Sequence, residues 1–179
     1  HDSSCPSKRT LERTPLQQPS AATAPRGVRA TLQNMKVAAW QAPLTVREPD
    51  QVVARLRTQV ERCEAAGVEV LCCPETVIGG LADGSPHPAR FALCDAELLE
   101  LLAPAASPSL AMIVGYIERG ADAVFNTAAI VRGGGIVGRY RKVYPGDRSA
   151  YEPGAELPVF TLGSSGAPCG IAICNDVQS

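Results

Sequence analysis

The sequence is poor in aromatic residues, close to neutral in charge and without a long apolar run. Aromatic side chains make up 4% of its 179 residues and the formal net charge is −1, so the basic surface and aromatic platforms of a nucleic-acid-binding protein are not indicated. No apolar run reaches the ~18 residues that a membrane-spanning helix needs. With 45% hydrophobic and 20% charged residues, the composition is typical of one soluble globular domain that binds neither nucleic acid nor membrane.

Histidine is also scarce, and the cysteines lack a metal-binding spacing. The two histidines are His1 and His87, and none of the seven cysteines stands in a CxxC pair. The sequence therefore predicts no metal site, and it lacks a persuasive Cys-His or Ser-His-Asp set. We interpret the cysteines as reduced thiols of a cytoplasmic protein, because a disulfide framework is less typical of a chain this long. They are Cys5, Cys63, Cys72, Cys73, Cys94, Cys169 and Cys174.

The first part of the chain differs in kind from the rest. Residues 1–34 are rich in Pro, Ser, Thr and Gln and carry no periodic apolar pattern, which predicts a disordered or extraneous leader. The composition changes sharply at Met35. Residues 35–179 are therefore predicted to form the folded domain.

The predicted domain alternates strands with helices. An amphipathic helix is predicted between Asp50, as its N-cap, and Gly67, as the glycine that follows its end, and a shorter helix over residues 95–103. The alternation implies parallel strands at the start, whereas the glycine turn at 133–135 implies an antiparallel hairpin. The sequence thus predicts an α/β fold with a mixed β-sheet and helices on one face. The predicted strands are residues 35–41, 68–73, 110–117, 124–132, 136–143, 158–162 and 169–173.

Three polar residues stand at the ends of predicted apolar strands, namely Glu75, Lys142 and Cys174. Open α/β sheets gather ligand-binding residues at such ends, and a thiol there can act as a nucleophile if a base and a cation accompany it. A carboxylate base with a lysine partner is the combination that the available residues permit. Each residue also has a structural interpretation: Glu75 as a solvated residue after a proline, Lys142 as a snorkelling side chain, and Cys174 as an inert buried thiol.

The strand that carries Lys142 is predicted to present two different faces. Strict alternation places Lys142 on one face with Ile136 and Tyr140, and it places Arg139 and Arg141 on the opposite face. We expect the arginine face to be solvated.

Four segments together resemble the nitrilase superfamily of carbon-nitrogen hydrolases. Residues 125–128 and 151–154 also match habits of that family. Any one segment is a weak signal, but four in the family's order are specific. The four are residues 35–41 (Met-Lys-Val-Ala-Ala-Trp-Gln), 71–75 (Leu-Cys-Cys-Pro-Glu), 140–145 (Tyr-Arg-Lys-Val-Tyr-Pro) and 170–176 (Gly-Ile-Ala-Ile-Cys-Asn-Asp).

The resemblance implies a catalytic triad of Glu75, Lys142 and Cys174, with the backbone N–H of Asn175 as an oxyanion donor. It implies hydrolysis of an amide, N-carbamoyl or nitrile bond through a cysteine thioester, without a metal or organic cofactor. It also implies the first part of a four-layer αββα sandwich and a homo-oligomer in the full-length form. Acyl transfer in place of hydrolysis remains open at this point.

The sequence departs from the family pattern around Cys174. Asn175 stands where the family commonly has an aromatic residue, and the usual Pro-Glu a few residues later is absent. The chain therefore resembles the N-terminal part of such a domain, ending just after the catalytic cysteine. Glu152 is a candidate for the second structural glutamate that many members carry. The alternative function is an inactive fragment or pseudo-enzyme that acts by binding a partner. A redox role for Cys72 and Cys73, or for Cys169, fits poorly because adjacent cysteines seldom form a disulfide and no CxxC spacing is present.

Overall fold

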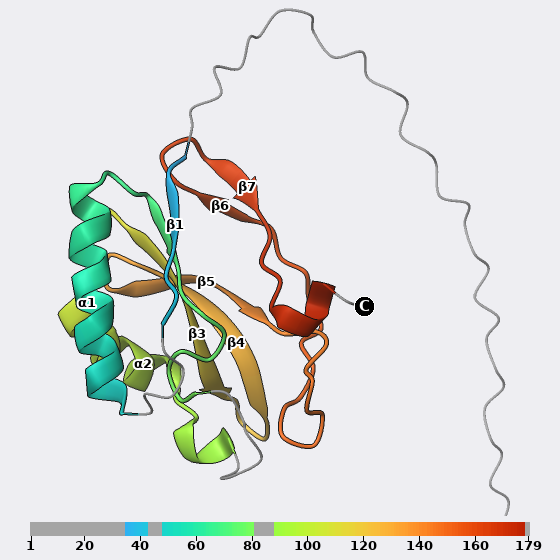
Figure 1. Cartoon of the computed structure of the whole chain (residues 1–179). Coiled ribbons are helices and arrows are strands. Elements are labelled where there is room, and N and C mark those ends of the chain that lie inside the picture. The colour runs from blue at the N-terminus through green and yellow to red at the C-terminus, as the bar shows by residue number, and fades with distance from the viewer. Residues whose placement is uncertain (1–34, 43–47, 81–87, 178–179) are drawn as a thin grey trace, which may run out of the picture. The chain divides into compact units, whose positions relative to one another are not determined.

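A five-stranded mixed sheet forms the centre of the protein (Figure 1). The computed structural model describes residues 35–42, 48–80 and 88–177; the predicted leader 1–34 lies outside them. Strands β1, β2 and β3 run parallel, and β3, β4 and β5 run antiparallel in the order β1-β2-β3-β4-β5. The predicted mixed sheet is confirmed. The strands span Val37–Ala39, Val70–Cys72, Ala111–Arg119, Val124–Arg132 and Gly135–Arg141.

Helix α1, Pro49–Ala65, is the longest helix of the described residues. Its N-cap is Glu48, so the predicted N-cap at Asp50 was wrong by two residues. The reason is Pro49, which occupies the first helical position, where its missing N–H is not needed and its fixed φ suits the helix. Asp50 instead lies in the first turn, where its negative charge favours the helix dipole. Gly67 has a φ of 66° and ends the helix as predicted.

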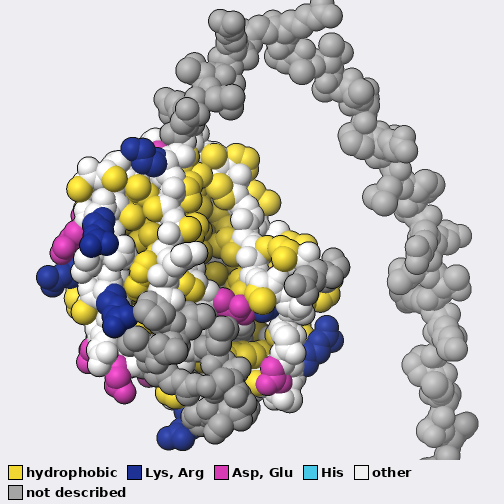
Figure 2. Space-filling model, viewed as in Figure 1, with side chains coloured by type: hydrophobic (Ala, Val, Ile, Leu, Met, Phe, Trp, Pro, Cys, Tyr) yellow, Lys and Arg dark blue, Asp and Glu magenta, His cyan; other side chains and the backbone are white. Residues whose placement is uncertain are grey.

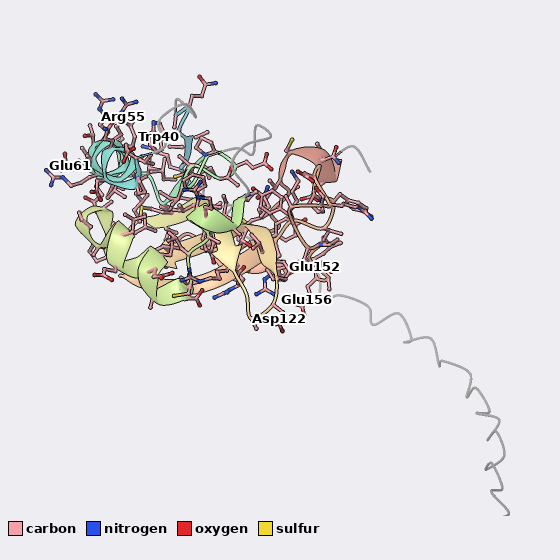
Figure 3. All side chains as sticks on the ribbon, turned by 90° about the horizontal axis from the view of Figure 1, so that it is seen from below. Trp40, Arg55, Glu61, Asp122, Glu152 and Glu156 are labelled. Carbon is pink, nitrogen blue, oxygen red and sulfur yellow. The ribbon has the colours of Figure 1, made fainter. Side chains whose placement is uncertain are left out.

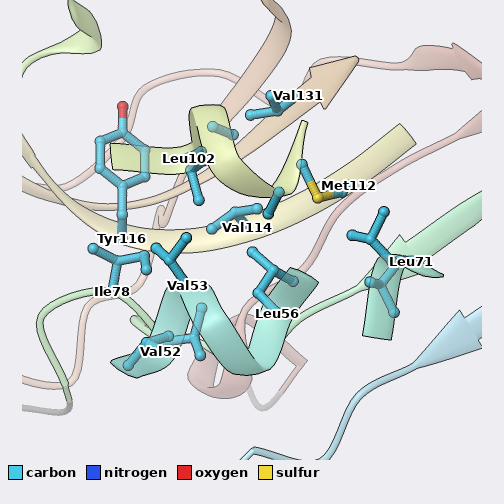
Figure 4. Close-up of a cluster of buried hydrophobic side chains, with 14 of the residues drawn as sticks. Val52, Val53, Leu56, Leu71, Ile78, Leu102, Met112, Val114, Tyr116 and Val131 are labelled. Atoms are coloured by element: carbon cyan, nitrogen blue, oxygen red, sulfur yellow. The ribbon is translucent and has the colours of Figure 1, made fainter. Parts of the chain in front are cut away.

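Both α-helices pack on one face of the sheet, as predicted (Figure 1). Helix α2, Asp95–Leu102, follows the short 3₁₀ helix Pro88–Phe91 and is followed by another, Ala103–Ala105. The side chains buried between helices and sheet form the main hydrophobic core (Figure 4). This core covers the helix-facing side of the sheet. Its labelled members include Val52, Val53, Leu56, Leu71, Leu102, Met112, Val114 and Tyr116.

A hairpin lies against the other face of the sheet. Strands β6, Phe160–Leu162, and β7, Ala167–Cys169, pair antiparallel, and Leu162 packs with Val70 and Ile130 of the main sheet. The predicted strand at 169–173 was wrong beyond Cys169: residues 170–173 form no strand, although Ile171 and Ile173 still pack against the sheet. The apolar pattern of residues 170–173 arises because alternate side chains, those of Ile171 and Ile173, are packed against the sheet. A strand needs a hydrogen-bonded neighbour as well, and the described residues offer none there.

A β-bulge changes which residues of β5 share a face. Val131 pairs with Ile136 and Ile130 pairs with Gly138, so Val137 is the extra residue. Ile136 therefore packs with the helix-side core, whereas Tyr140 packs with the cluster on the opposite face. The prediction that Ile136 shares a face with Lys142 was wrong, because strict alternation cannot anticipate a bulge.

None of the helices in the described residues is both long and apolar enough to span a membrane.

Candidate active site

Glu75 lies in a turn that follows β2 and presses against β3. The backbone of Pro74 and Thr76 passes so close to Gly115 that a Cβ there would lie 2.4 Å from the Pro74 oxygen and 2.5 Å from the Thr76 nitrogen. Only glycine fits at that position of β3. The turn then rejoins the sheet, because Ile78 N–H donates to the Gly115 carbonyl at 3.1 Å. Glu75 is thereby held at the carboxyl end of the parallel strands.

Glu75 and Lys142 form a short ion pair on the sheet face opposite the helices. The distance from Lys142 Nζ to Glu75 Oε1 is 2.6 Å, and the side chains are 4% and 18% exposed. Lys142 follows β5, its N–H donates to the Asn126 carbonyl at 2.8 Å, and its own carbonyl accepts the Gly154 N–H at 2.8 Å. These two hydrogen bonds fix the backbone of Lys142, from which its side chain extends to Glu75. The structure thus joins two of the three predicted triad residues directly.

Cys174 opens a 3₁₀ turn, Cys174–Val177, close to the end of the described chain. Asp176 anchors this turn: its Oδ2 accepts the Tyr140 hydroxyl at 2.7 Å and the Ile173 N–H at 2.9 Å, and its Oδ1 accepts the Tyr144 N–H at 2.9 Å. Burial, reinforced by the bond to Asp176, raises the pKa of Tyr140 to about 12. The hydroxyl therefore remains a donor at neutral pH. Cys174 itself is exposed.

The backbone is strained at two places near the predicted site residues. Among the described residues, Thr76 and Cys174 are the non-glycine residues with a left-handed φ, 44° and 46°. For a β-branched residue such as threonine this conformation is a genuine outlier. Strained residues of this kind gather at functional sites, where the surrounding structure holds them in place. One adjoins Glu75, and the other is the predicted nucleophile.

Glu75 and Cys174 line one cavity of about 340 Å³, a size that suits a small ligand. Lys142 is not among the lining residues and contacts the site through Glu75. Figure 2, which views the β1 edge of the sheet, shows hydrophobic side chains gathered between the β1 edge and the β6–β7 hairpin. The remaining lining is largely apolar or backbone: Cys72, Cys73, Pro74, Ile113, Gly115, Ala128 and residues 170–173. Asn175, whose N–H was predicted as an oxyanion donor, directly follows Cys174, the last of the lining residues.

Two further thiols line the cavity, but their surroundings suppress their reactivity. Burial, and then the neighbouring thiols of Cys72 and Cys63, raises the pKa of Cys73 far above its usual range. Burial and the nearby Cys169 also raise the pKa of Cys72. A thiol with a raised pKa holds little thiolate and is a poor nucleophile. Within the described ranges, no group of three His, Cys, Asp or Glu side chains could hold a metal ion.

Asn126 and Tyr151 belong to the site; sequence analysis noted the segments 125–128 and 151–154 that contain them but gave neither residue a role. Asn126, on β4, donates from Nδ2 to Glu75 Oε1 at 2.7 Å. Tyr151 is buried, and burial together with the charge of Glu75 raises its pKa to about 12. A polar residue in the otherwise apolar run of β4 was the signal that could have identified Asn126. Glu152, the candidate for a second glutamate, is exposed at the surface (Figure 3).

A second buried carboxylate lies on the helix side of the sheet. Glu118, on β3, is 3% exposed, and its side chain accepts hydrogen bonds from Arg139, Arg141 and Thr127. Arg139 also pairs with Asp95 of α2. The two arginines are 33% and 38% exposed. The prediction of a solvated arginine face was therefore right only in part: both arginines reach solvent, but Glu118 from the neighbouring strand pairs with both guanidinium groups.

Comparisons with known proteins agree with this fold. A model of the carbon-nitrogen hydrolase family matches residues 36–179. An (R)-stereoselective amidase of Pseudomonas sp is 28% identical over 130 residues, which are 70% of this chain and 46% of the amidase. An amidase structure from Nesterenkonia sp. has a TM-score of 0.63 at 20% identity, covering 81% of this chain and 57% of the amidase.

A nitrilase-superfamily protein from Saccharomyces cerevisiae has a TM-score of 0.62 at 18% identity, covering 81% of this chain and 57% of that protein. At this identity the structural likeness shows the fold alone. The chain spans about half the length of these three proteins.

Proposed function

Because the chain belongs to the carbon-nitrogen hydrolase family, we propose that it carries a site for hydrolysing non-peptide carbon-nitrogen bonds. Cys174 is the nucleophile of this proposal, Glu75 the general base and acid, and Lys142 the cation. The observation that carries it is the 2.6 Å pair of Lys142 and Glu75, with Glu75 lining the same cavity as Cys174.

In the first half of the proposed reaction, Cys174 Sγ attacks the carbonyl carbon of an amide or carbamoyl group while its proton passes to Glu75. The carbonyl π electrons move onto oxygen. The oxyanion is stabilised by the Asn175 N–H and by the positive charge of Lys142, which acts from behind Glu75. When the intermediate collapses, the carbon-nitrogen bond breaks and Glu75 gives its proton to the departing ammonia or amine. The product is a thioester on Cys174.

In the second half, water attacks the thioester carbon and Glu75 accepts the proton of that water. The carbon-sulfur bond then breaks, the acid product leaves, and a proton returns to Cys174. An amine that replaces water at this step would give acyl transfer. A nitrile would instead form a thioimidate by adding the thiol across its triple bond. None of these steps requires a cofactor, since every proton is accounted for by Glu75, Cys174 and water.

The lining of the cavity supports a small substrate with an uncharged acyl part. Glu75 is the one charged side chain among the described lining residues, and Ile113, Ala128 and Ile171 provide an apolar wall. An apolar wall favours burial of a hydrocarbon chain and disfavours an unpaired charge. The six described cysteines are free, which supports a reducing compartment such as the cytoplasm. We also propose a homo-oligomer for the full-length form.

An exposed apolar surface favours a second candidate function, binding of a partner without catalysis. Val37 is 50% exposed, Leu157 77% and Val159 73%, and the chain spans about half the length of its relatives. Exposed apolar surface of this kind marks an interaction site when it is contiguous. The absence of turnover with every compound of the panel described next would favour this candidate.

The test measures ammonia release from short linear amides, N-carbamoyl amino acids and nitriles by the 179-residue chain. Cys174→Ala should reduce turnover by at least about 10³-fold, because the variant cannot form a thioester. Mass spectrometry of the acid-quenched wild type should show an acyl adduct on the Cys174 peptide. Cys169→Ala removes a thiol outside the cavity and should retain activity. An active Cys174→Ala variant would refute the assignment of the nucleophile.

A further inference from the structure

Asn126 contacts both members of the Glu75–Lys142 pair. Its side-chain Nδ2 donates to Glu75 Oε1 at 2.7 Å, and its backbone carbonyl accepts the Lys142 N–H at 2.8 Å. Asn126 is 5% exposed and lies in the central part of the sheet, where β4 is hydrogen-bonded to β3 and β5. One residue of a rigid strand therefore fixes the carboxylate by its side chain and the lysine by its backbone.

The two oxygens of Glu75 are in different situations. Oε1 accepts two hydrogen bonds, from Asn126 Nδ2 at 2.7 Å and from Lys142 Nζ at 2.6 Å. Oε2 has no partner among the described residues. An oxygen that already accepts two strong bonds has little capacity to take a proton, so the proton acceptor of the pair is Oε2.

Electrostatics determine how the Asn126 amide is oriented. Turning the amide over would place Oδ1, a partial negative charge, against the Glu75 carboxylate oxygen that Nδ2 now contacts. With Nδ2 toward Glu75, Oδ1 is buried and without a hydrogen-bond partner in the part of the chain that the structure describes.

We propose that Asn126 is the positioning residue of the site: together with Lys142 it occupies Oε1 of Glu75 and leaves Oε2 as the oxygen that exchanges protons. The inference rests on the proposed function, since it assigns a task to the base of that reaction. Asn126 acts through Glu75 and does not contact the substrate. Its removal should therefore impair the proton-transfer steps and leave binding largely intact.

Two substitutions at this position separate positioning from simple structural support. Asn126→Ala removes the donor to Oε1, so either oxygen of Glu75 can rotate toward Lys142. We expect kcat to fall about 10- to 100-fold, with KM changed by less than about threefold.

Asn126→Asp keeps the shape of the side chain but places a second carboxylate beside Glu75. Two such close carboxylates do not both ionise readily, so the acidic limb of the rate profile should move up by about one pH unit or more.

A second readout does not depend on turnover. The rate at which iodoacetamide alkylates Cys174, followed by mass spectrometry of its peptide from pH 4 to 9, reports how readily the thiol loses its proton. Asn126→Asp should shift this profile to higher pH, and Asn126→Ala should slow alkylation near neutral pH. Glu75→Gln, measured in parallel, should remove the part of the alkylation rate near neutral pH that depends on Glu75, and leave only the rise at high pH that comes from ionisation of the thiol to solvent.

Thr127→Val is the matched control on the same strand. Thr127 is also buried and donates to a carboxylate, but that carboxylate is Glu118 on the opposite face. Its substitution should lower the unfolding temperature without moving either pH profile. If Glu75→Gln loses reactivity while both Asn126 variants keep the wild-type kcat and profiles, the positioning role is refuted and the proposed function stands. If Glu75→Gln itself retains reactivity, the proposed function fails.

Discussion

Glu75 and Glu118 lie at the same end of the sheet, on opposite faces, and their surroundings differ. Neighbouring residues of β4 contact them: Asn126 binds Glu75 and Thr127 binds Glu118. The Glu118 oxygens both accept hydrogen bonds, from two arginines as well as Thr127. Glu75 borders a cavity, and among the described residues only one of its two oxygens accepts hydrogen bonds.

The difference separates a structural charge from a reactive one. Burial by itself would raise the pKa of Glu118, but hydrogen bonds from Arg141 and Thr127 and the charges of both arginines outweigh burial, so the pKa lies below its usual range. A carboxylate saturated in this way stays ionised and has no free oxygen for a proton. A carboxylate with one free oxygen beside a cavity can accept a proton from a ligand or a thiol. Burial and charge alone therefore do not identify a general base. The base is distinguished by a carboxylate oxygen that does not already accept hydrogen bonds.

The largest expected effect is on stability, from Glu118→Gln. The variant leaves Arg139 and Arg141 without their shared carboxylate and turns an amide donor toward them. Breaking a buried ion pair costs about 3–5 kcal/mol, and we expect about 3 kcal/mol because both arginines are partly exposed and can regain water. Urea unfolding measures this loss. In the folded fraction, iodoacetamide should alkylate Cys174 at the wild-type rate. A slower rate would show that Glu118 contributes to the site, and would contradict its assignment as a purely structural charge.

A smaller effect is expected from Gly115→Ala, which tests how closely the Glu75 turn packs on β3. The new methyl group would overlap backbone atoms of Pro74 and Thr76, and backbone cannot move aside as a flexible side chain can. We expect a loss of about 1–3 kcal/mol, together with slower alkylation of Cys174 as Glu75 is displaced. Gly146→Ala is the matched control, since no atom lies within 4 Å of its added Cβ. Equal behaviour of the two variants would contradict a role for this close approach.

The smallest effect is the pH dependence of stability that Glu118 contributes. Its pKa is lower in the folded than in the unfolded protein, so its contribution is fully present above the unfolded value of about 4.3 and is lost as the pH falls through the folded value. The difference in unfolding free energy between wild type and Glu118→Gln should thus be constant from pH 7 to 5 and shrink below about pH 4. Urea titrations at pH 7, 5 and 3.5 measure it. A difference that grows in acid would reverse the sign of the argument.

Much of the fold could be predicted from local patterns. Strand β4 matches its predicted range, and helix α1 ends before Gly67 as predicted, because apolar periodicity and a left-handed glycine act over a few residues. The predictions failed where a distant residue decided the outcome. Arg139 and Arg141 were placed in solvent because nothing near them in the chain reveals Glu118. The face of Ile136 was wrong because a bulge depends on how two strands register.

The sequence by itself determined the order of strands and helices, the family, and the three residues proposed for the chemistry, because short motifs and hydrophobic periods are written along the chain. The tertiary structure alone decided that Asn126 bridges Glu75 and Lys142. It alone decided that arginines saturate Glu118, whereas one oxygen of Glu75 has no partner in the part of the chain that the structure describes. It also decided that Gly115 lets the Glu75 turn approach β3. The physical reason is range: hydrogen bonds and close contacts join residues that are neighbours in space, and only the folded sheet brings them together.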